Sequence, residues 1–195
     1  LSVTGLVNPK DVKKNNGTQC GDVLILTKPL GVGLTLNALR MDDCSKEMQE
    51  RVFKSMTTLN KYACDVLKKY DVHALTDVTG FGLLVHLNEM LDEKNSAVIY
   101  KDSIPYFDDC QKYVEEFYLS GAAQTNRNSV EGKIYFDCDF FTEEILFDPQ
   151  TSGGLLASVS KEDLENLEID FKENNHELYV VGEVIEKNEY NVYVR

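Results

Sequence analysis

The sequence of 195 residues has no tryptophan and only three histidines, His73, His86 and His176, which lie far apart. A metal site built from clustered histidines is therefore not indicated. The cysteines are odd in number and form no Cys-x-x-Cys pair, which argues against a zinc site and against the disulfide framework of a small secreted domain. They are Cys20, Cys44, Cys64, Cys110 and Cys138.

Basic residues are also few, because 20 Lys and Arg stand against 33 Asp and Glu, a formal charge of −13. Such a chain lacks the basic face that binds a nucleic-acid backbone or an anionic membrane surface. No apolar run approaches the roughly 18 residues of a membrane span, and the first residues do not read as a secretory signal. We therefore expect a cytoplasmic protein with no nucleic-acid and no membrane partner.

The hydrophobic residues make up 43% of the chain, enough for one core, so we expect one domain plus edges. Leu1–Val7 and Val23–Leu26 read as strands, the second buried on both faces, and residues 8–20 read as a polar linker. Residues 45–70 carry apolar side chains at steps of three and four, which predicts a helix. Further strands are predicted at 71–76, 97–100, 155–159, 178–185 and 190–194, the last two as a hairpin around 187–189, and further helices at 82–93, 106–119 and 161–171. Strands that alternate with helices predict a layered α+β or α/β fold.

Asp77–Gly82, with the sequence Asp-Val-Thr-Gly-Phe-Gly, separates a predicted strand from a predicted helix. Backbone N–H groups at a helix start are unpaired and carry the positive end of the helix dipole, so they suit an anion. Gly80 and Gly82 would let this backbone approach a ligand, because glycine has no Cβ. Asp77 could hold Mg²⁺, which takes oxygen ligands and bridges to phosphates. The alternative is an ordinary capped turn, in which Asp and Thr are helix-entry residues.

Two other segments contain the same residue types. Asp148–Leu155 places an Asp, two hydroxyl groups and a glycine pair before an apolar run. Leu26–Gly31 ends a predicted strand, since Pro29 bars the continuation of a central ladder. Lys28 in this segment either faces an active-site cleft or is a surface lysine on a turn, and the sequence leaves both readings open.

In this order and spacing, the three segments resemble the C-terminal half of selenophosphate synthetase (selenide, water dikinase), within the superfamily of aminoimidazole ribonucleotide synthetases. The resemblance covers nearly the whole chain, from Val3–Val7 to the terminal strand. Sister families share the Asp-x-Thr-Gly element, whereas Thr27–Gly31 and Pro149–Gly154 are typical of the selenophosphate branch. The resemblance implies an α+β fold, a three-layer mixed β-sheet with flanking helices. It also implies that residues 1–20 are the last strand of a missing N-terminal ATP-binding domain plus a linker, and that 21–195 are the C-terminal domain.

The family reaction makes selenophosphate, AMP and phosphate from ATP, selenide and water. In the family, the nucleophilic Cys or selenocysteine, its neighbouring Lys and most nucleotide contacts lie in the N-terminal half. The resemblance therefore gives no catalytic residue to this chain, and we expect it to be inactive alone. It implies ATP and selenide as substrates, the N-terminal half as partner, a homodimer at full length, and Asp77 as a ligand of Mg²⁺. The residues that it implies at the nucleotide are Lys28, Thr79, Gly80, Gly82, Thr151, Ser152, Gly153 and Gly154.

The chain departs from the family pattern at two places. Val85 stands where the family commonly has Gly before a His, which suggests slightly different packing of that helix. Residues 121–128 lack the two glycines of a Gly-Gly-Thr-x-Arg-Asn element, so Arg127 either faces an anion or is a surface residue of a polar loop. Two other functions stay open, the same domain of a sister enzyme of purine or thiamine metabolism and a non-catalytic binding or dimerisation module.

Overall fold

The computed structural model describes residues 4–9 and 12–195, and its seven strands within these ranges form one mixed sheet in the order β2-β5-β1-β6-β3-β7-β4. The strands are β1 (Val23–Leu26), β2 (Val72–Asp77), β3 (Asn95–Ile99), β4 (Ile134–Phe136), β5 (Leu155–Val159), β6 (Tyr179–Glu186) and β7 (Val192–Val194). The helices are α1 (Val32–Arg40), α2 (Lys46–Thr57), α3 (Lys61–Leu67), α4 (Gly82–Met90), α5 (Cys110–Glu115), α6 (Gly121–Ser129), α7 (Phe140–Phe147) and α8 (Leu164–Glu173), with short 3₁₀ turns η1 (Lys101–Ser103) and η2 (Lys161–Asp163).

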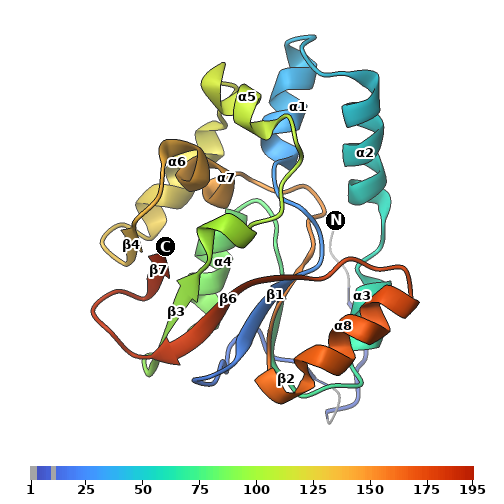
Figure 1. Ribbon diagram of the computed structural model, residues 1–195, viewed down its shortest axis with the longest axis vertical. Coiled ribbons are helices and arrows are strands. Elements are labelled where there is room, and N and C mark those ends of the chain that lie inside the picture. Colours follow the sequence, from blue (N-terminus) through green and yellow to red (C-terminus); the bar gives the residue numbers. More distant parts are fainter. Residues whose placement is uncertain (1–3, 10–11) are drawn as a thin grey trace.

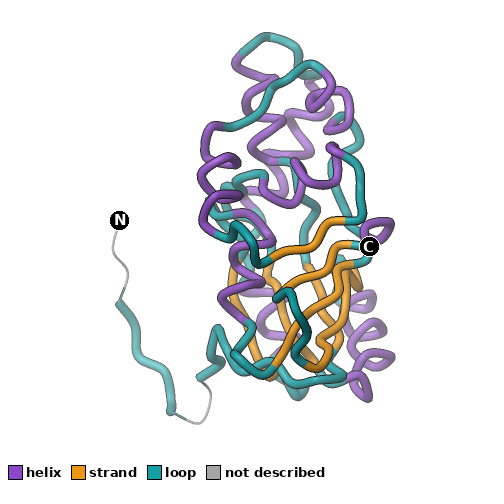
Figure 2. Tube along the Cα trace, turned by 90° about the vertical axis from the view of Figure 1, so that its left-hand side faces the viewer, coloured by secondary structure: helices purple, strands orange, loops and turns teal. Residues whose placement is uncertain are grey.

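The layers follow from the side chains of β1, which alternate between two buried faces as expected for such a strand. Leu24 and Leu26 belong to a hydrophobic cluster with residues of α1, α2, α4, α5, α6 and α7. Val23 and Ile25 belong to a second cluster with residues of α3 and α8. Helices therefore cover both faces of the sheet, and α1, α2 and α5 extend beyond one of its ends (Figures 1 and 2). The prediction of a three-layer α+β fold is confirmed.

The predicted closing hairpin is wrong, because β3 lies between β6 and β7. β3 pairs antiparallel with β6 and parallel with β7, and β7 pairs parallel with β4. The connection after β6 instead crosses the first residues of β3. The hydroxyl of Ser96 holds it there, accepting from the Asn188 N–H at 3.0 Å and donating to the Tyr190 carbonyl at 2.7 Å.

Several predicted helices have other bounds in the structure. Residues 45–70 form two helices, α2 and α3, because the chain becomes extended at Thr58. The predicted helix 106–119 is only α5, the predicted helix 161–171 begins with η2 before α8, and α4 ends at Met90. The polar loop expected at 121–128 is instead helix α6, capped by the Ser120 hydroxyl, which accepts from the Ala122 N–H at 3.2 Å. α1 and α7 have no counterpart in the sequence predictions.

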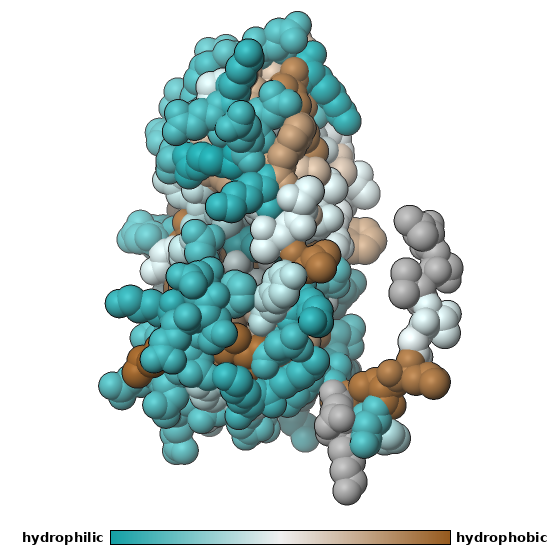
Figure 3. Space-filling model, turned by 90° about the vertical axis from the view of Figure 1, so that its right-hand side faces the viewer, coloured by the Kyte–Doolittle hydropathy of each residue, from teal (hydrophilic) through white to brown (hydrophobic). Residues whose placement is uncertain are grey.

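The N-terminal arm stands off the body of the molecule (Figures 2 and 3). Residues 4–7 belong to no strand and are exposed, and the other part of the predicted strand Leu1–Val7 lies outside the described residues. The arm rejoins the body at Lys14, whose carbonyl accepts from the Leu75 N–H of edge strand β2 at 2.9 Å. The assignment of residues 1–20 to another domain stays a prediction. Among the described residues, no helix combines the length and the apolar character that crossing a membrane would require.

Candidate functional site

The three glycine-containing segments meet at one end of the sheet. β5 runs antiparallel between β1 and β2, with Leu156 opposite both Leu26 and Thr76. The segments that follow β1 and β2 therefore leave the sheet where the third segment enters β5. We call them the Lys28 segment (27–31), the Asp77 segment (77–82) and the Ser152 segment (148–154).

Backbone hydrogen bonds join the Asp77 segment to the Ser152 segment. The Val78 N–H donates to the Gly154 carbonyl at 2.8 Å, and the Gln150 N–H donates to the Thr79 carbonyl at 3.0 Å. Two bonds of this kind, one near each end of the Ser152 segment, fix the spacing between the two segments. The candidate site is therefore an ordered surface built from three distant parts of the sequence.

Asp148 begins the Ser152 segment and caps helix α1. Its carboxylate accepts from the Gly33 N–H and from the Gln150 amide, both at 2.9 Å, and the Gln150 side-chain oxygen accepts from the Val32 N–H at 3.3 Å. Burial raises the pKa of Asp148 to about 7, although the Gly33 and Gln150 donors act in the opposite direction. The start of α1 is thus occupied by the chain's own side chains, and it is not free for a phosphate. Sequence reasoning did not assign Asp148 this role, because its position before Pro149 resembles no helix-capping pattern.

The glycines of the site serve close packing more than ligand approach. A Cβ on Gly153 would collide with the Val78 carbonyl oxygen, and one on Gly154 would lie 2.6 Å from the Lys28 backbone nitrogen. Gly80 is different, because a Cβ there would meet no atom within 4 Å. Among these three, Gly80 is therefore the glycine whose backbone has open space for a ligand.

Asn126 of α6 holds the Asp77 segment by hydrogen bonds from its side chain. Its side-chain amide donates to the Gly80 carbonyl at 2.9 Å and to the Phe147 carbonyl at 3.1 Å. Gly82 has a positive φ of 72°, and a Cβ there would lie 2.8 Å from the Phe147 carbonyl oxygen. Nothing in the local sequence around Asn126 reveals this long-range contact, so its role could not be predicted from the sequence.

Asp77 is the exposed last residue of β2, so its carboxylate faces solvent at the end of the sheet. It lines a shallow hollow of about 570 Å³ together with Lys13, Lys61 and Cys64. Within the described parts of the chain, no three His, Cys, Asp or Glu side chains come close enough to hold a metal ion. Asp77 could therefore contribute one oxygen ligand to a cation whose other ligands come from elsewhere.

Thr79 is held by His86 of helix α4. The Thr79 N–H donates to Nε2 of His86 at 3.1 Å, and the Thr79 hydroxyl lies at the same distance from that nitrogen. Burial lowers the pKa of His86, although the carboxylates of Glu89 and Asp77 act in the opposite direction. The neutral ring is the form that can accept from Thr79, so burial of His86 favours the observed geometry.

Lys28 is buried, so the reading of a surface lysine on a turn is wrong, and its role at the nucleotide stays a prediction. Its ammonium donates to the Thr58 carbonyl at 2.8 Å and to the Ser152 carbonyl at 2.9 Å, and thus ties the Ser152 segment to the turn between α2 and α3. Thr151 and Ser152 are exposed, and Ser152 has a left-handed φ of 51°. Their hydroxyl groups are therefore presented on the surface of the site.

Arg127 lies on helix α6 and not on a loop. Its guanidinium contacts the Glu144 carboxylate at 2.8 Å and lies over the Phe147 ring, 4.9 Å from the ring centre. Glu144 is buried, so this pair supplies the counter-charge that a buried carboxylate needs. The structure gives Arg127 a protein carboxylate as its partner.

The chain matches the family "AIR synthase related protein, C-terminal domain" over residues 19–195. It is 43% identical to a selenide, water dikinase of Agathobacter rectalis, in an alignment that covers 100% of this chain and 57% of that protein. The chain thus spans little more than half the length of the curated relatives it matches.

Solved structures show the same fold at low sequence identity. Thiamine-monophosphate kinase from Stenotrophomonas maltophilia K279a superposes with a TM-score of 0.67 at 16% identity, over 96% of this chain and 54% of that one. The hydrogenase maturation protein HypE, solved in complex with ATP, superposes with a TM-score of 0.60 at 17% identity, over 91% of this chain and 46% of that one.

Proposed function

The chain belongs to the family of AIR synthase related protein C-terminal domains, and from this premise we propose that it is the C-terminal domain of a selenide, water dikinase. The assignment to the selenide, water dikinases is supported by relatives of that name that align along this whole chain. The full-length protein would make selenophosphate, AMP and phosphate from ATP, selenide and water. The observation that carries the proposal is the meeting of the Lys28, Asp77 and Ser152 segments at one end of the sheet.

In this proposal the domain helps to close a nucleotide site whose other wall is the N-terminal half. Asp77 would contribute one oxygen ligand to Mg²⁺, and its exposed carboxylate fits that role. The cation would neutralise charge on the phosphates during phosphoryl transfer. The nucleotide and its phosphates would contact residues of all three segments, namely Lys28, Thr79, Gly80, Gly82, Thr151, Ser152, Gly153 and Gly154. Of the glycines, Gly80 has the open space for a direct contact.

ATP as the nucleotide is supported by a structural neighbour that was solved with ATP. The proposed partners are ATP, selenide and the N-terminal half, with a homodimer as the full-length assembly. The alternative of a sister enzyme of thiamine metabolism shares the fold, but its representative is 16% identical to this chain against 43% for the dikinase relative. Selenide-dependent AMP formation by the full-length protein separates the two.

The test of the proposal is Asp77→Asn in the full-length protein. Asn keeps the size and the turn-forming ability of Asp, so a capping role would survive. A neutral amide is a poorer Mg²⁺ ligand, and the loss of one such contact costs on the order of 10²-fold in turnover, about 2.7 kcal/mol. We expect a folded protein with low turnover and a raised Mg²⁺ requirement.

Turnover across a Mg²⁺ titration and the melting temperature are measured on the same preparation. The matched control is Asp102→Asn, at another exposed aspartate, on η1, which should leave the Mg²⁺ requirement unchanged. Near-normal turnover of Asp77→Asn at limiting Mg²⁺ would mean that Asp77 is only a turn residue.

A further inference from the structure

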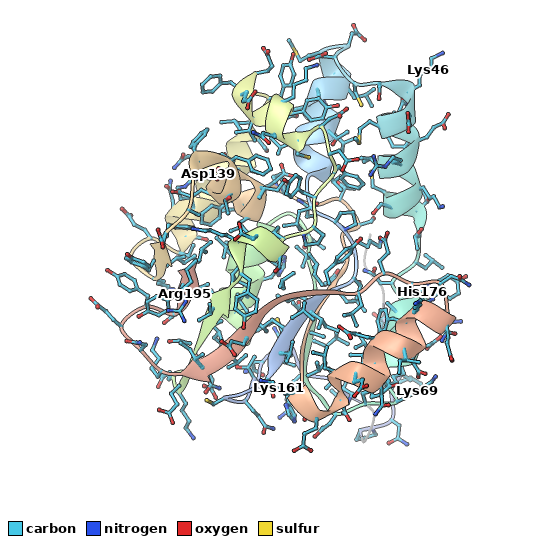
Figure 4. All side chains as sticks on the ribbon, in the orientation of Figure 1. Lys46, Lys69, Asp139, Lys161, His176 and Arg195 are labelled. Atoms are coloured by element: carbon cyan, nitrogen blue, oxygen red, sulfur yellow. The ribbon has the colours of Figure 1, made fainter. Side chains whose placement is uncertain are left out.

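A second hollow lies next to the Asp77 hollow, on the side of the molecule where α2 faces the C-terminal end of α8 (Figures 1 and 3). It is a cleft of about 590 Å³ between the end of α2, the start of α3, the Lys28 segment, residues 105–108 and residues 175–179. Figure 4 labels His176, which follows α8 and lines this cleft. Asn60 lines both hollows, and its amide donates to the Gly153 carbonyl at 2.9 Å.

Three cationic side chains line this cleft in a chain whose formal charge is −13. Lys28 comes from the strand end, and Arg51 and Lys54 come from the last turns of α2. The carboxylates on the cleft are Asp108 and Glu177, and Asp108 pairs with Arg51 at 2.7 Å. Cations are thus concentrated where the overall composition would not lead one to expect them.

Lys28 is the unusual member of this group, since only 7% of its surface is exposed. Its ammonium has three N–H donors, and two of them bind the carbonyls of Thr58 and Ser152. Both partners are neutral, and no carboxylate in the described part of the chain lies within ion-pair distance of Lys28. A buried charge without a counter-charge is costly, and burial lowers the pKa of Lys28. An anion in the cleft would supply the missing counter-charge.

Apolar side chains form part of the wall, between polar ones such as Ser55, Asn60 and Asn175, and the cleft is larger than a bare phosphate requires. The apolar residues on it are Pro29, Leu59, Ala63, Pro105 and Phe107. We propose that the cleft binds a small phosphate-bearing molecule, with Lys28, Arg51 and Lys54 at the phosphate and the apolar wall against the remainder. The site is complete in this chain. It rests on the proposed function in one respect, because Lys28 is also among the residues proposed at the nucleotide. It places the anion that Lys28 meets in this cleft, away from the Mg²⁺ end at Asp77.

The experiment titrates the 195-residue chain with inorganic phosphate and with phenyl phosphate, and follows backbone amides by ¹H–¹⁵N NMR. We expect saturable shifts confined to the cleft, with phenyl phosphate binding several-fold more tightly because its ring contacts the apolar wall. Lys54→Met should weaken phenyl phosphate binding about five- to tenfold. Lys46→Met, on the same helix but outside the cleft, should leave it unchanged.

Asp108→Asn should raise the affinity for phenyl phosphate, and a folding defect cannot produce such a gain. It frees Arg51 from its partner, and the Asp108 side chain is 75% exposed, so we expect tighter binding of phenyl phosphate with an unchanged melting temperature. Lys28→Met should abolish binding. Where that variant fails to fold, Lys54→Met and Asp108→Asn still decide.

The proposal is wrong if neither probe gives saturable shifts, if the shifts spread over the whole surface, or if Lys46→Met and Lys54→Met behave alike. Its failure is distinguishable from failure of the proposed function, because the dikinase test depends on Asp77 and Mg²⁺ in the full-length protein. Low turnover of the Asp77→Asn enzyme, together with no binding of either phosphate probe in the cleft, would overturn only the present inference. Phosphate binding together with a normal Asp77→Asn enzyme would overturn only the metal role.

Discussion

At the scale of single residues, the site depends on buried polar groups whose partners lie far away in the sequence. Asp148 caps a helix that begins 116 residues earlier, at Val32. Asn126 holds a carbonyl at Gly80. A local pattern reveals that an Asp or Asn is present, but not which carbonyl or N–H group it will meet. Sequence reasoning therefore found the exposed Asp77 and the residues beside it, and it missed the two buried residues that hold the segments in place.

Asp148 gives a prediction for the pH dependence of stability. Its pKa is about 7 in the folded chain against a usual value of 3.8, so the folded state holds the proton more tightly. The stability that this group contributes is complete below pH 4 and is lost as the pH rises to about 7. The size of the effect is about 4 kcal/mol, to order of magnitude.

Asp148→Asn removes this titration and keeps a capping side chain. Urea unfolding of both proteins from pH 4 to pH 8 should show a flatter profile for the variant. Asp139, labelled in Figure 4, is a contrasting control, because the side-chain and backbone bonds from Thr142 lower its pKa. Its contribution is lost as the pH falls, so Asp139→Asn should matter least at acid pH. Parallel profiles for wild type and Asp148→Asn would contradict the prediction.

At the scale of elements, periodicity located the strands and helices better than it located their ends or their partners. The apolar spacing of residues 45–70 continues through the break at Thr58, because α2 and α3 both turn apolar faces to a core, although to different clusters. The hairpin prediction failed for a related reason. β6 and β7 are consecutive and each carries buried residues, but the hydroxyl of Ser96 and the pairing of β3 with both strands are not visible in either strand's own pattern.

The glycines give a prediction at this scale, because they determine how closely the segments approach. Alanine at position 153 would place its Cβ against the Val78 carbonyl oxygen, which is backbone and cannot move without breaking the contact between the segments. We expect Gly153→Ala to cost roughly 1–3 kcal/mol of unfolding free energy. Gly80→Ala meets no atom within 4 Å and should leave the free energy within about 0.5 kcal/mol of wild type.

Thermal unfolding of the two variants measures this difference. In the full-length protein, the proposed function adds that Gly80→Ala should weaken nucleotide binding while the melting temperature stays near that of wild type. Equal destabilisation by both alanines would show that the packing explanation of Gly153 is mistaken.

At the scale of the whole molecule, the alternation of strands and helices predicted a layered fold and left α+β and α/β open, and the resemblance added the α+β class and the three layers. The face seen in Figure 3 is largely hydrophilic, which fits the excess of acidic residues in this chain. Residues 4–9 extend away from this body. What the sequence could not provide is the meeting of three segments at one sheet end, since strand order depends on pairings between residues more than 100 positions apart.

The last prediction concerns this chain as a catalyst, and it follows from what the assembled site contains. Phosphoryl transfer needs a nucleophile, a metal held on more than one side, and donors around the phosphates. Within the Lys28, Asp77 and Ser152 segments, Asp77 has the one exposed carboxylate. Among the described residues, no group of three side chains that could hold a metal ion surrounds it. We therefore expect the purified 195-residue chain to form no AMP from ATP and selenide above the rate without protein.

Mixing the chain with a separately purified N-terminal half of a dikinase relative should restore AMP formation, and mixing in the Asp77→Asn chain should restore far less. The comparison matters because both chains share the same fold, so a difference between them can only come from the site. Selenide-dependent AMP formation by the chain alone would show that a complete phosphate site exists within it. The cleft lined by Lys28, Arg51 and Lys54 would then be the first place to search for that site, since cations of this acidic chain converge there.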